Sequence, residues 1–430
     1  MNLIIKNGTI VDPSQDIHEV GNVYIKDESI EKIVLKEDEV SGDAADVIDA
    51  AGKYVFPGFI DLHVHFRDPG LTYKEDIVTG SEAAAAGGVT TVCCMPNTKP
   101  VVDSVETLKD ILDRAAELPI RLEQLSAITI GENNEELVDI AAMKEAGAIA
   151  FSEDGKSVMD SVLFEKGLKE IAKSGLVCMS HCEEKNLVQG GVINYGVASE
   201  KYNVKGIKND VEDVIAARDI FMAAEEGARL HLCHCSTRGT VELMKMAKNM
   251  GLNVTAEVCP HHFVLSDSDI TSVDGNFKMN PPLRSKEDVK ALVEGLKSGV
   301  MDCISTDHAP HSAEEKSHGF DSPFGIVGLE TSAALTYNYL VLKEDMPVDQ
   351  MVRLMSYNPA KVIGLDKERG TLRSGAKADI VIFDPKKEWV VDTSKFRSKG
   401  KNTPFNGYEL TGKCVTTICR GKVVYDETQQ

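Results

Sequence analysis

The middle of the chain alternates apolar strand-like runs with amphipathic helical stretches, and this alternation restricts the fold more than any other feature. Eight runs read as strands: residues 55–66, 90–97, 120–129, 148–155, 175–183, 229–236, 253–262 and 302–311. Helical patterns separate them, as at 73–88, 105–118, 135–147 and 213–227. Eight such units over about 300 residues predict an α/β fold of the TIM (β/α)8 barrel type, with its active site at the C-terminal ends of the strands. A doubly wound open sheet is the alternative, but it does not require eight strands, and no G-x-G-x-x-G follows the first one.

Both ends of the chain have a different, β-rich texture. Short alternating runs occupy residues 3–12, 21–27 and 29–35, and similar runs return at 378–385, 388–392, 415–421 and 422–427. Separate β modules at each end are the alternative, but each is too short to bury a core alone. We therefore expect one small β-sandwich domain formed from both termini. The predicted parts are 1–53 and 361–430 for this domain and 54–360 for the barrel.

Composition limits the partners and the compartment. The 430 residues carry a formal charge of −21, and no basic block offsets it, which argues against nucleic-acid or anionic-membrane binding. The chain shows neither a signal-like segment nor an apolar run of about 18 residues, so we expect a cytoplasmic protein. Ten cysteines without any C-x-x-C pair argue against structural zinc and favour reduced, buried thiols.

Polar residues gather where the predicted strands stop. His63 and His65 lie one residue apart and would project from the same face of a strand, which favours a metal site over two core histidines. The residues at the ends of strands one, four, five, six and eight are His63, His65, Asp154, His181, His234 and Asp307. Each alone could be a turn former, a helix cap or a core residue. Together on one rim, imidazoles and carboxylates suit two zinc-like ions that remain open to water, and two such ions favour hydrolytic chemistry.

Several motifs occur in a fixed order: "HVHFRDPG", "MPNTKP", "FSEDG", "EVCPHH", "MNPPLR", "STDHAPH" and "SPFGIVGLET". With them, the chain resembles the amidohydrolase superfamily and, within it, the dihydroorotase family of the long bacterial type. The resemblance runs from "NGTIVD" to "GAKADIVIFDP". It implies zinc-dependent, reversible cyclisation of N-carbamoyl-L-aspartate to (S)-dihydroorotate with loss of water, the third step of de novo pyrimidine (UMP) synthesis.

The resemblance also assigns roles to residues. It implies two Zn²⁺ per subunit, bridged by Asp154 and by a hydroxide that acts as nucleophile, with His63 and His65 on one ion and His181 and His234 on the other. Asp307 would bind metal and shuttle the proton. The substrate contacts it implies are His65, Arg67, Asn97, Asn280, His311, Phe324 and Gly325. Arg67 and Asn97 would hold the substrate carboxylate, for which a guanidinium fork is well shaped.

Six histidines fall outside these sets, and of these we expect His18 and His318 to be solvated. We interpret His261 and His262 as structural or as supports of the ligands. His231 has the wrong strand parity for the rim, and His308, beside Asp307, is ambiguous.

Alternatives remain on three points. Hydantoinases, allantoinases and some dihydroorotases bridge their metals with a carboxylated lysine in strand four; here that strand contains none, and Lys156 lies just beyond it, so Asp154 is the preferred bridge. A hydantoinase- or allantoinase-like enzyme is the rival activity. An inactive scaffold that binds aspartate transcarbamoylase is the rival class, disfavoured because all six ligands are present. We expect a homodimer, and association of an active enzyme with aspartate transcarbamoylase stays open.

Overall fold

A closed barrel of parallel strands forms the centre of the computed structural model, which describes residues 2–35 and 46–429. Its strands, in chain order, are β6 (Phe59–Val64), β7 (Val89–Cys94), β8 (Arg121–Gln124) continued by β9 (Ser126–Ala127), β10 (Ala150–Ser152), β11 (Val177–Ser180), β14 (Arg229–Leu232), β15 (Val254–Val258) and β16 (Cys303–Ile304). Each pairs in parallel with the next. A parallel bridge between Val64 and His308 joins the last strand to the first. The predicted TIM barrel is confirmed.

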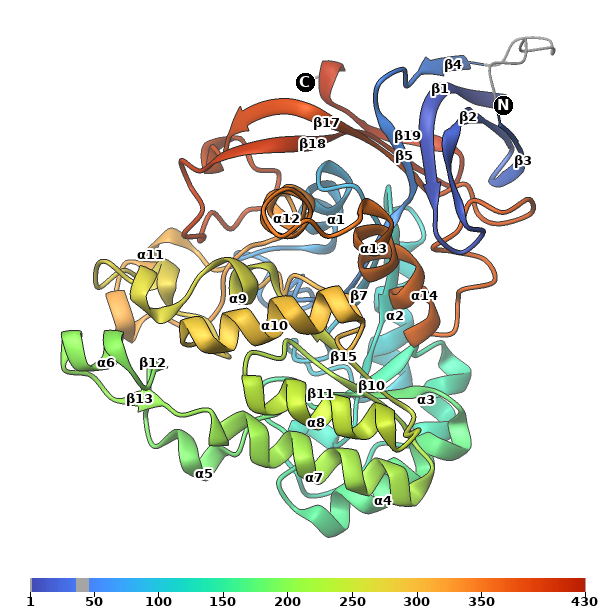
Figure 1. Ribbon diagram of the computed structural model, residues 1–430. Coiled ribbons are helices and arrows are strands. Elements are labelled where there is room, and N and C mark those ends of the chain that lie inside the picture. The colour runs from blue at the N-terminus through green and yellow to red at the C-terminus, as the bar shows by residue number, and fades with distance from the viewer. Residues whose placement is uncertain (1, 36–45, 430) are drawn as a thin grey trace.

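Helices surround the barrel (Figure 1). The main ones are α1 (Ile77–Ala86), α2 (Val105–Ala115), α3 (Ile140–Ala146), α4 (Ser161–Ser174), α7 (Asp210–Glu226), α8 (Arg238–Asn249) and α10 (Lys286–Ser298), followed after β16 by α12 (Ser332–Thr336), α13 (Val348–Val352) and α14 (Asn358–Val362). Most of the long helices begin after an Asp, Ser or Thr whose side chain accepts a backbone N–H, as Asp160 does for α4 and Ser285 for α10. The main core cluster packs strand residues such as Leu230 against helix residues such as Leu168 and Ile220.

Strands from both termini share one sheet, at the top of Figure 1. Its order is β19-β18-β17-β5-β1-β2-β3, with β4 also paired to β1. The bounds are β1 (Asn2–Asp12), β2 (Ile17–Lys26), β3 (Ser29–Leu35), β4 (Asp46–Asp49), β5 (Tyr54–Pro57), β17 (Ile380–Val390), β18 (Glu409–Cys419) and β19 (Lys422–Asp426). Ile5 and Val23 lie in one buried cluster with Ile380 and Ile418. The β domain formed from both termini is confirmed, and its exact limits stay a prediction.

One long strand replaces two predicted ones. Residues 378–385 and 388–392 fall largely within the single strand β17, which pairs Asp384 with Lys413 and then Glu388 with Thr411. Two extra residues therefore bulge from β17 between these pairs. Pro385, which has no N–H to donate to a ladder, lies inside the bulge, so an interruption in the pattern marks a bulge and not a strand end.

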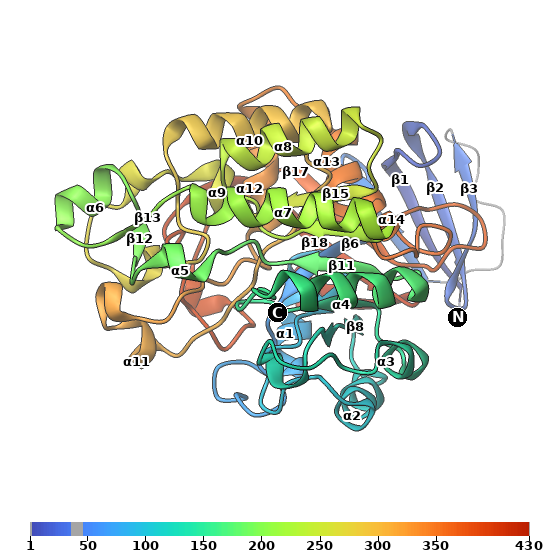
Figure 2. The same cartoon turned by 90° about the horizontal axis from the view of Figure 1, so that it is seen from below.

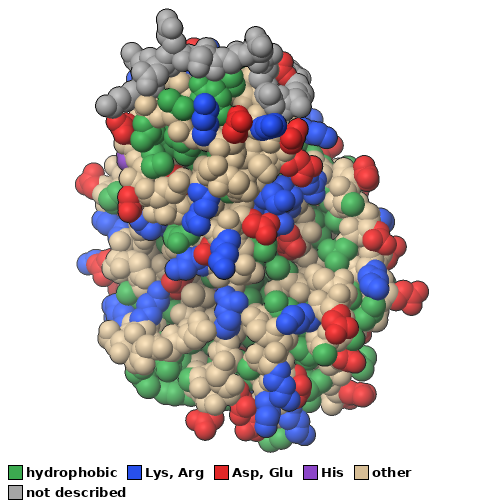
Figure 3. All heavy atoms as spheres, turned by 90° about the vertical axis from the view of Figure 1, so that its right-hand side faces the viewer, with side chains coloured by type: hydrophobic (Ala, Val, Ile, Leu, Met, Phe, Trp, Pro, Cys, Tyr) green, Lys and Arg blue, Asp and Glu red, His purple; other side chains and the backbone are tan. Residues whose placement is uncertain are grey.

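An excursion from the barrel lies between β11 and α7. It contains α5 (Lys185–Val188), β12 (Ile193–Asn194), α6 (Val197–Tyr202) and β13 (Gly206–Ile207), and it projects at the left of Figures 1 and 2. The strand–helix alternation does not predict it. Elsewhere, on the face seen in Figure 3, acidic and basic side chains are interspersed, so neither sign forms a continuous patch there. No helix among the described residues has both the length and the apolar character needed to span a membrane.

Candidate metal centre and active site

The six predicted metal ligands come together at one end of the barrel. They belong to β6 or to the segments just after β6, β10, β11, β14 and β16: His63, His65, Asp154, His181, His234 and Asp307. All six side chains are buried. Parallel strands of a closed barrel end on one rim, which explains why residues more than 240 positions apart meet here.

Asp154 lies at the centre of this cluster. Its Oδ1 is 3.3 Å from Nε2 of His63, 3.5 Å from Nδ1 of His181 and 3.7 Å from Nε2 of His234. Its Oδ2 is 3.5 Å from Nε2 of His65. One carboxylate therefore faces both predicted histidine pairs.

Asp307, which follows the last strand of the barrel, lies against the first histidine pair, His63 and His65. Its Oδ1 lies 3.0 Å from Nε2 of His65 and 3.7 Å from Nε2 of His63. Since the bridge between Val64 and His308 closes the barrel at this point, the position of Asp307 depends on barrel closure.

The cluster has the donor atoms that a pair of divalent cations requires. Buried polar atoms without a hydrogen-bond partner include Nε2 of His63, Oδ1 of Asp154, Nε2 of His181 and Nδ1 of His234. Leaving such a group unpaired costs about 1–3 kcal/mol. Donor atoms within 4.8 Å of one another form two sets, His63 with His65 and Asp154, and Asp154 with His181 and His234. Nitrogen and oxygen donors that share one carboxylate fit two ions of the zinc type.

Protons and metal ions compete for the side chains of the cluster. Burial opposes ionisation of Asp154, but the charge at His63 and the contacts of His181 and His234 hold the pKa of this carboxyl well below its ordinary range. Burial likewise opposes a charge on His181, but its contacts with Asp154 and Glu183 raise its pKa to about 10. A metal ion must therefore displace protons from this histidine, so metal affinity should fall at low pH.

Glu257 of β15 is a buried member of the site that no sequence pattern predicts. Its Oε1 lies 3.1 Å from Nδ1 of His63 and accepts the backbone N–H of His234 at 3.3 Å. Its Oε2 lies 3.0 Å from Nε2 of His231 and accepts the Ser305 hydroxyl at 2.5 Å. Because a carboxylate accepts, Nδ1 of His63 carries a proton, and Nε2, which faces Asp154, can bind a metal ion once that ion has displaced the Nε2 proton. The one available signal is a lone acid in the short strand "VTAEV".

Three residues of the site adopt left-handed backbone conformations. The φ angles are +60° at Arg67, +36° at His234 and +48° at Asp307. Non-glycine residues rarely adopt positive φ, and such residues concentrate at functional sites because the surrounding structure must hold them there.

Arg67, Lys74 and His311 lie together beside the cluster. Nη2 of Arg67 lies 3.5 Å from Nε2 of His311, and its Nε donates to the carbonyl of Pro310 at 3.4 Å. Nε2 of His311 donates to the carbonyl of Phe324 at 2.8 Å, while Nζ of Lys74 lies 3.3 Å from its Nδ1. Burial, together with the charges of Arg67 and Lys74, lowers the pKa of His311 to about 3, so this histidine is neutral. Lys74 is a second residue that the sequence does not single out.

The remaining predicted contacts lie around these two groups. The Asn97 carbonyl accepts from Nδ1 of His65 at 3.0 Å, and its amide donates to Oδ2 of Asp154 at 3.0 Å. The Asn280 amide donates to Glu183, whose carboxylate lies 3.7 Å from Nε2 of His181.

Gly325 is adjacent to His311 and has a φ of +129°. A Cβ on Gly325 would lie 2.7 Å from that of Ala309 and 3.2 Å from Nε2 of His311, so a side chain there would crowd the His311 ring.

Lys156 points away from the metal cluster. Its Nζ lies 3.4 Å from the carbonyl of Gly131 and 3.9 Å from Glu132, and 42% of its side chain is exposed. His308 is held elsewhere too, with Nδ1 accepting the Gly328 N–H at 3.2 Å and Nε2 3.5 Å from Glu75. All ten cysteines are buried and free, as their spacing predicts.

Comparisons with known proteins show the family of the chain. The model of the amidohydrolase family matches residues 54–424. The dihydroorotase of Pelotomaculum thermopropionicum is 46% identical over 428 residues, which cover 99% of each chain, and that of Caldicellulosiruptor saccharolyticus is 45% identical over 424 residues, which cover 98% of each. Among solved structures, the L-hydantoinase (dihydropyrimidinase) from Arthrobacter aurescens superposes with a TM-score of 0.90 at 30% identity, covering 99% of this chain and 96% of the other.

Proposed function

The chain belongs to the amidohydrolase family, and from this premise we propose that the cluster around Asp154 is the active site of a dihydroorotase. The reaction joins the ureido nitrogen of N-carbamoyl-L-aspartate to its side-chain carboxyl, closes the ring of (S)-dihydroorotate and releases water, as a step of pyrimidine biosynthesis. The observation that carries the proposal is the approach of four histidines to one buried carboxylate, next to Arg67 and a neutral His311.

The proposed ligands divide into two sets that share Asp154. His63 and His65, with Asp307, would hold one Zn²⁺, and His181 and His234 the other. Bound divalent cations supply a Lewis acid for the carbonyl and lower the pKa of a water molecule, so hydrolysis and its reversal can proceed at neutral pH. The unpaired buried atoms of His63, His181 and His234 support this assignment.

Asp307 is the proposed proton carrier. In the hydrolytic direction its carboxylate takes a proton from the attacking water and delivers it to the ring nitrogen that leaves the carbonyl carbon. In the cyclising direction the same carboxylate takes the proton from the ureido nitrogen and returns it to the departing oxygen. The short contact of Asp307 with His65 fixes its orientation, and general acid–base groups require such a fixed position.

Arg67 and Asn97 are the proposed receptor for the substrate carboxylate, with Asn280, His311, Phe324 and Gly325 lining the ring. His65 contributes to both the metal and the substrate side. The cations near the neutral His311 are Arg67, Lys74 and Lys316. Lys74 is partly compensated by Glu315 at 2.8 Å, and burial lowers the pKa of Lys316 to about 7. Arg67 is thus the principal electrostatic attraction for an anionic ring.

A comparison of two substrates distinguishes dihydroorotase activity from hydantoinase activity. Hydantoins lack the ring carboxylate that Arg67 would bind, so we expect cyclisation of carbamoyl-aspartate to exceed hydantoin hydrolysis strongly in protein purified without chelator. Metal analysis of the same sample should give two zinc ions per chain. Efficient hydantoin hydrolysis without carbamoyl-aspartate cyclisation would instead assign a hydantoinase.

We also propose that the chain forms a homodimer and acts in the cytoplasm. Association with aspartate transcarbamoylase is an open alternative. The proposal is supported by the resemblance of the motifs and by the free thiols. Light scattering of the purified chain, alone and mixed with aspartate transcarbamoylase, tests both associations.

A further inference from the structure

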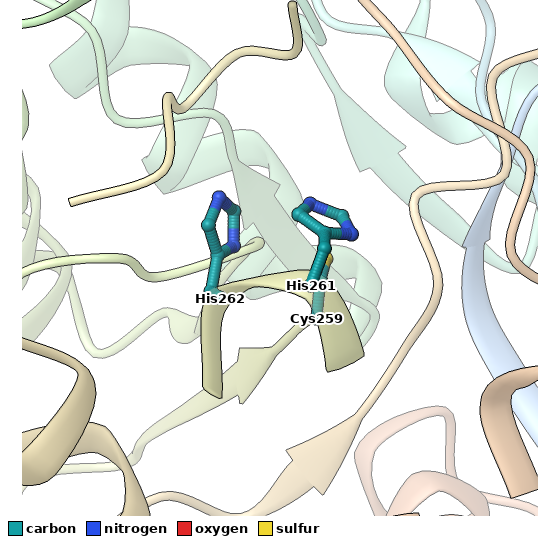
Figure 4. A group of neighbouring side chains, drawn as sticks. All are labelled: Cys259, His261 and His262. Atoms are coloured by element: carbon teal, nitrogen blue, oxygen red, sulfur yellow. The ribbon is translucent and has the colours of Figure 1, made fainter. Parts of the chain in front are cut away.

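A second group of metal-type donors lies beside β15, outside the six ligands described above. Cys259, His261 and His262 surround Pro260 at the start of the short helix α9 (Pro260–Val264). The exposed fractions of these three residues are 0%, 2% and 1%. One donor atom from each lies within 4.8 Å of the other two. The two imidazole rings stand side by side, with Cys259 behind His261 (Figure 4).

The hydrogen bonds of His262 leave a free lone pair within this group. Its Nε2 lies 2.9 Å from the carbonyl of Pro281. A carbonyl only accepts, so the proton is on Nε2 and Nδ1 is a bare acceptor. Nδ1 of His262 and Nε2 of His261 are both buried without a hydrogen-bond partner. Two unpaired ring nitrogens in one buried cluster are costly unless another group completes their hydrogen bonding or coordination.

Neutral imidazole and thiolate are the forms of these side chains that bind metals, so an ion that binds here must displace the thiol proton of Cys259.

We propose that Cys259, His261 and His262 form an additional metal site, separate from the two-ion centre, for a borderline-soft transition ion of the zinc class. Sγ of Cys259, Nε2 of His261 and Nδ1 of His262 are the donors. Sulfur and imidazole together select Zn²⁺ over Mg²⁺ or Ca²⁺, which prefer oxygen. The Nε2–H bond from His262 to Pro281 orients that ring, as outer hydrogen bonds do for ligating histidines. None of these residues belongs to the proposed catalytic set, so the site stands or falls independently of it.

Cobalt substitution of the full-length protein tests this site, because a thiolate bound to Co²⁺ gives a near-ultraviolet charge-transfer band that nitrogen and oxygen ligands do not give. Cys259→Ala should abolish the band and lower the metal content by one ion per chain. Cys233→Ala is the matched control: Cys233 is equally buried and close to His63 and Glu257, and its loss should leave the band in place.

His262→Gln provides a second test, because the glutamine amide can still donate to Pro281 but offers no ring nitrogen to a metal. We expect it to lose the same single ion while unfolding at a temperature close to that of the original protein. A metal content and cobalt spectrum unchanged in both Cys259→Ala and His262→Gln would overturn the proposal. A band that disappears in Cys233→Ala and survives in Cys259→Ala would overturn it as well.

Discussion

His63 and Glu257 form a fully buried pair, with Nδ1 of the histidine 3.1 Å from Oε1 of the glutamate. The same glutamate accepts hydrogen bonds from His231 and Ser305 and from the backbone of His234. Burial opposes its ionisation, but the contacts with His231 and His63 hold the pKa of Glu257 far below its ordinary value. A single acid therefore orients residues of three neighbouring strands around the metal cluster.

Glu257→Gln should weaken metal binding without unfolding the barrel. The amide nitrogen of glutamine donates where the carboxylate accepts, so His63 or His231 loses its partner, and the orientation of the His63 ring toward the metal is no longer fixed. We expect zinc affinity to fall about 10–100-fold, measured by competition with a chromogenic chelator. Glu242→Gln, on the exposed face of α8, is the control and should bind zinc normally. Unaltered affinity in Glu257→Gln would show that the histidine needs no such support.

Asp307→Asn should retain the fold and lose turnover. Asparagine has a similar shape but cannot carry the proton between water and the ring nitrogen, so we expect kcat to fall about 10²-fold or more in both directions. Assays with carbamoyl-aspartate and with dihydroorotate, together with thermal unfolding, check this. Asp113→Asn on the exposed side of α2 should match the original protein in every measurement. Full activity of Asp307→Asn would remove the proton-carrying role.

Arg67→Lys should fail to rescue Arg67→Ala. A guanidinium presents two parallel N–H donors to a carboxylate, whereas an ammonium is a point charge that cannot reproduce the fork. We expect KM for dihydroorotate to rise by a similar factor in both variants, with Arg353→Lys, near the terminal β domain, as an unaffected control. A lysine variant with near-normal KM would exclude Arg67 from the carboxylate receptor.

The meeting of the six proposed ligands at one rim could be predicted because each lies at the end of an apolar run and parallel strands bring their ends together. Glu257 and Lys74 could not be predicted in the same way. Glu257 sits inside a strand, where sequence alone does not say which histidine it faces. Lys74 contacts His311, which is 237 residues away in the sequence. Both lie in loops whose paths depend on closure of the barrel. The bulge at Pro385 and the excursion after β11 could not be predicted either. The local sequence pattern indicates where helices and strands lie, but it does not indicate where they depart from regular pairing.

Glu330 gives a pH dependence of stability that is independent of the metal cluster. Its carboxylate accepts the backbone N–H groups of Arg397 and Ser398, and burial raises its pKa from 4.5 to about 7. Between these values the folded chain holds a proton that the unfolded chain has lost, so stability falls as pH rises from 4.5 to 7.

Glu330→Gln removes this group, and its stability advantage over the original protein should grow across that interval by about 3 kcal/mol at most. Denaturant unfolding of both proteins at about pH 5, 6 and 7.5, with the same metal content, gives the difference between their free energies of unfolding. A difference that stays constant with pH would mean that Glu330 is ionised throughout.

The proposed bridge between the two zinc ions, Asp154, can be tested against the alternative of a carboxylated lysine. A carboxylated lysine forms from CO₂ and is lost reversibly, whereas an aspartate is always ionised near neutral pH. Asp154 faces all four histidines, and Nζ of Lys156 instead lies near Gly131 and Glu132. We therefore expect metal-free protein to regain full activity with zinc in CO₂-depleted buffer. Asp154→Ala should lose at least one ion, and Lys156→Ala should still bind both. Reconstitution that requires bicarbonate, with a metal-poor Lys156→Ala, would identify the lysine as the bridge.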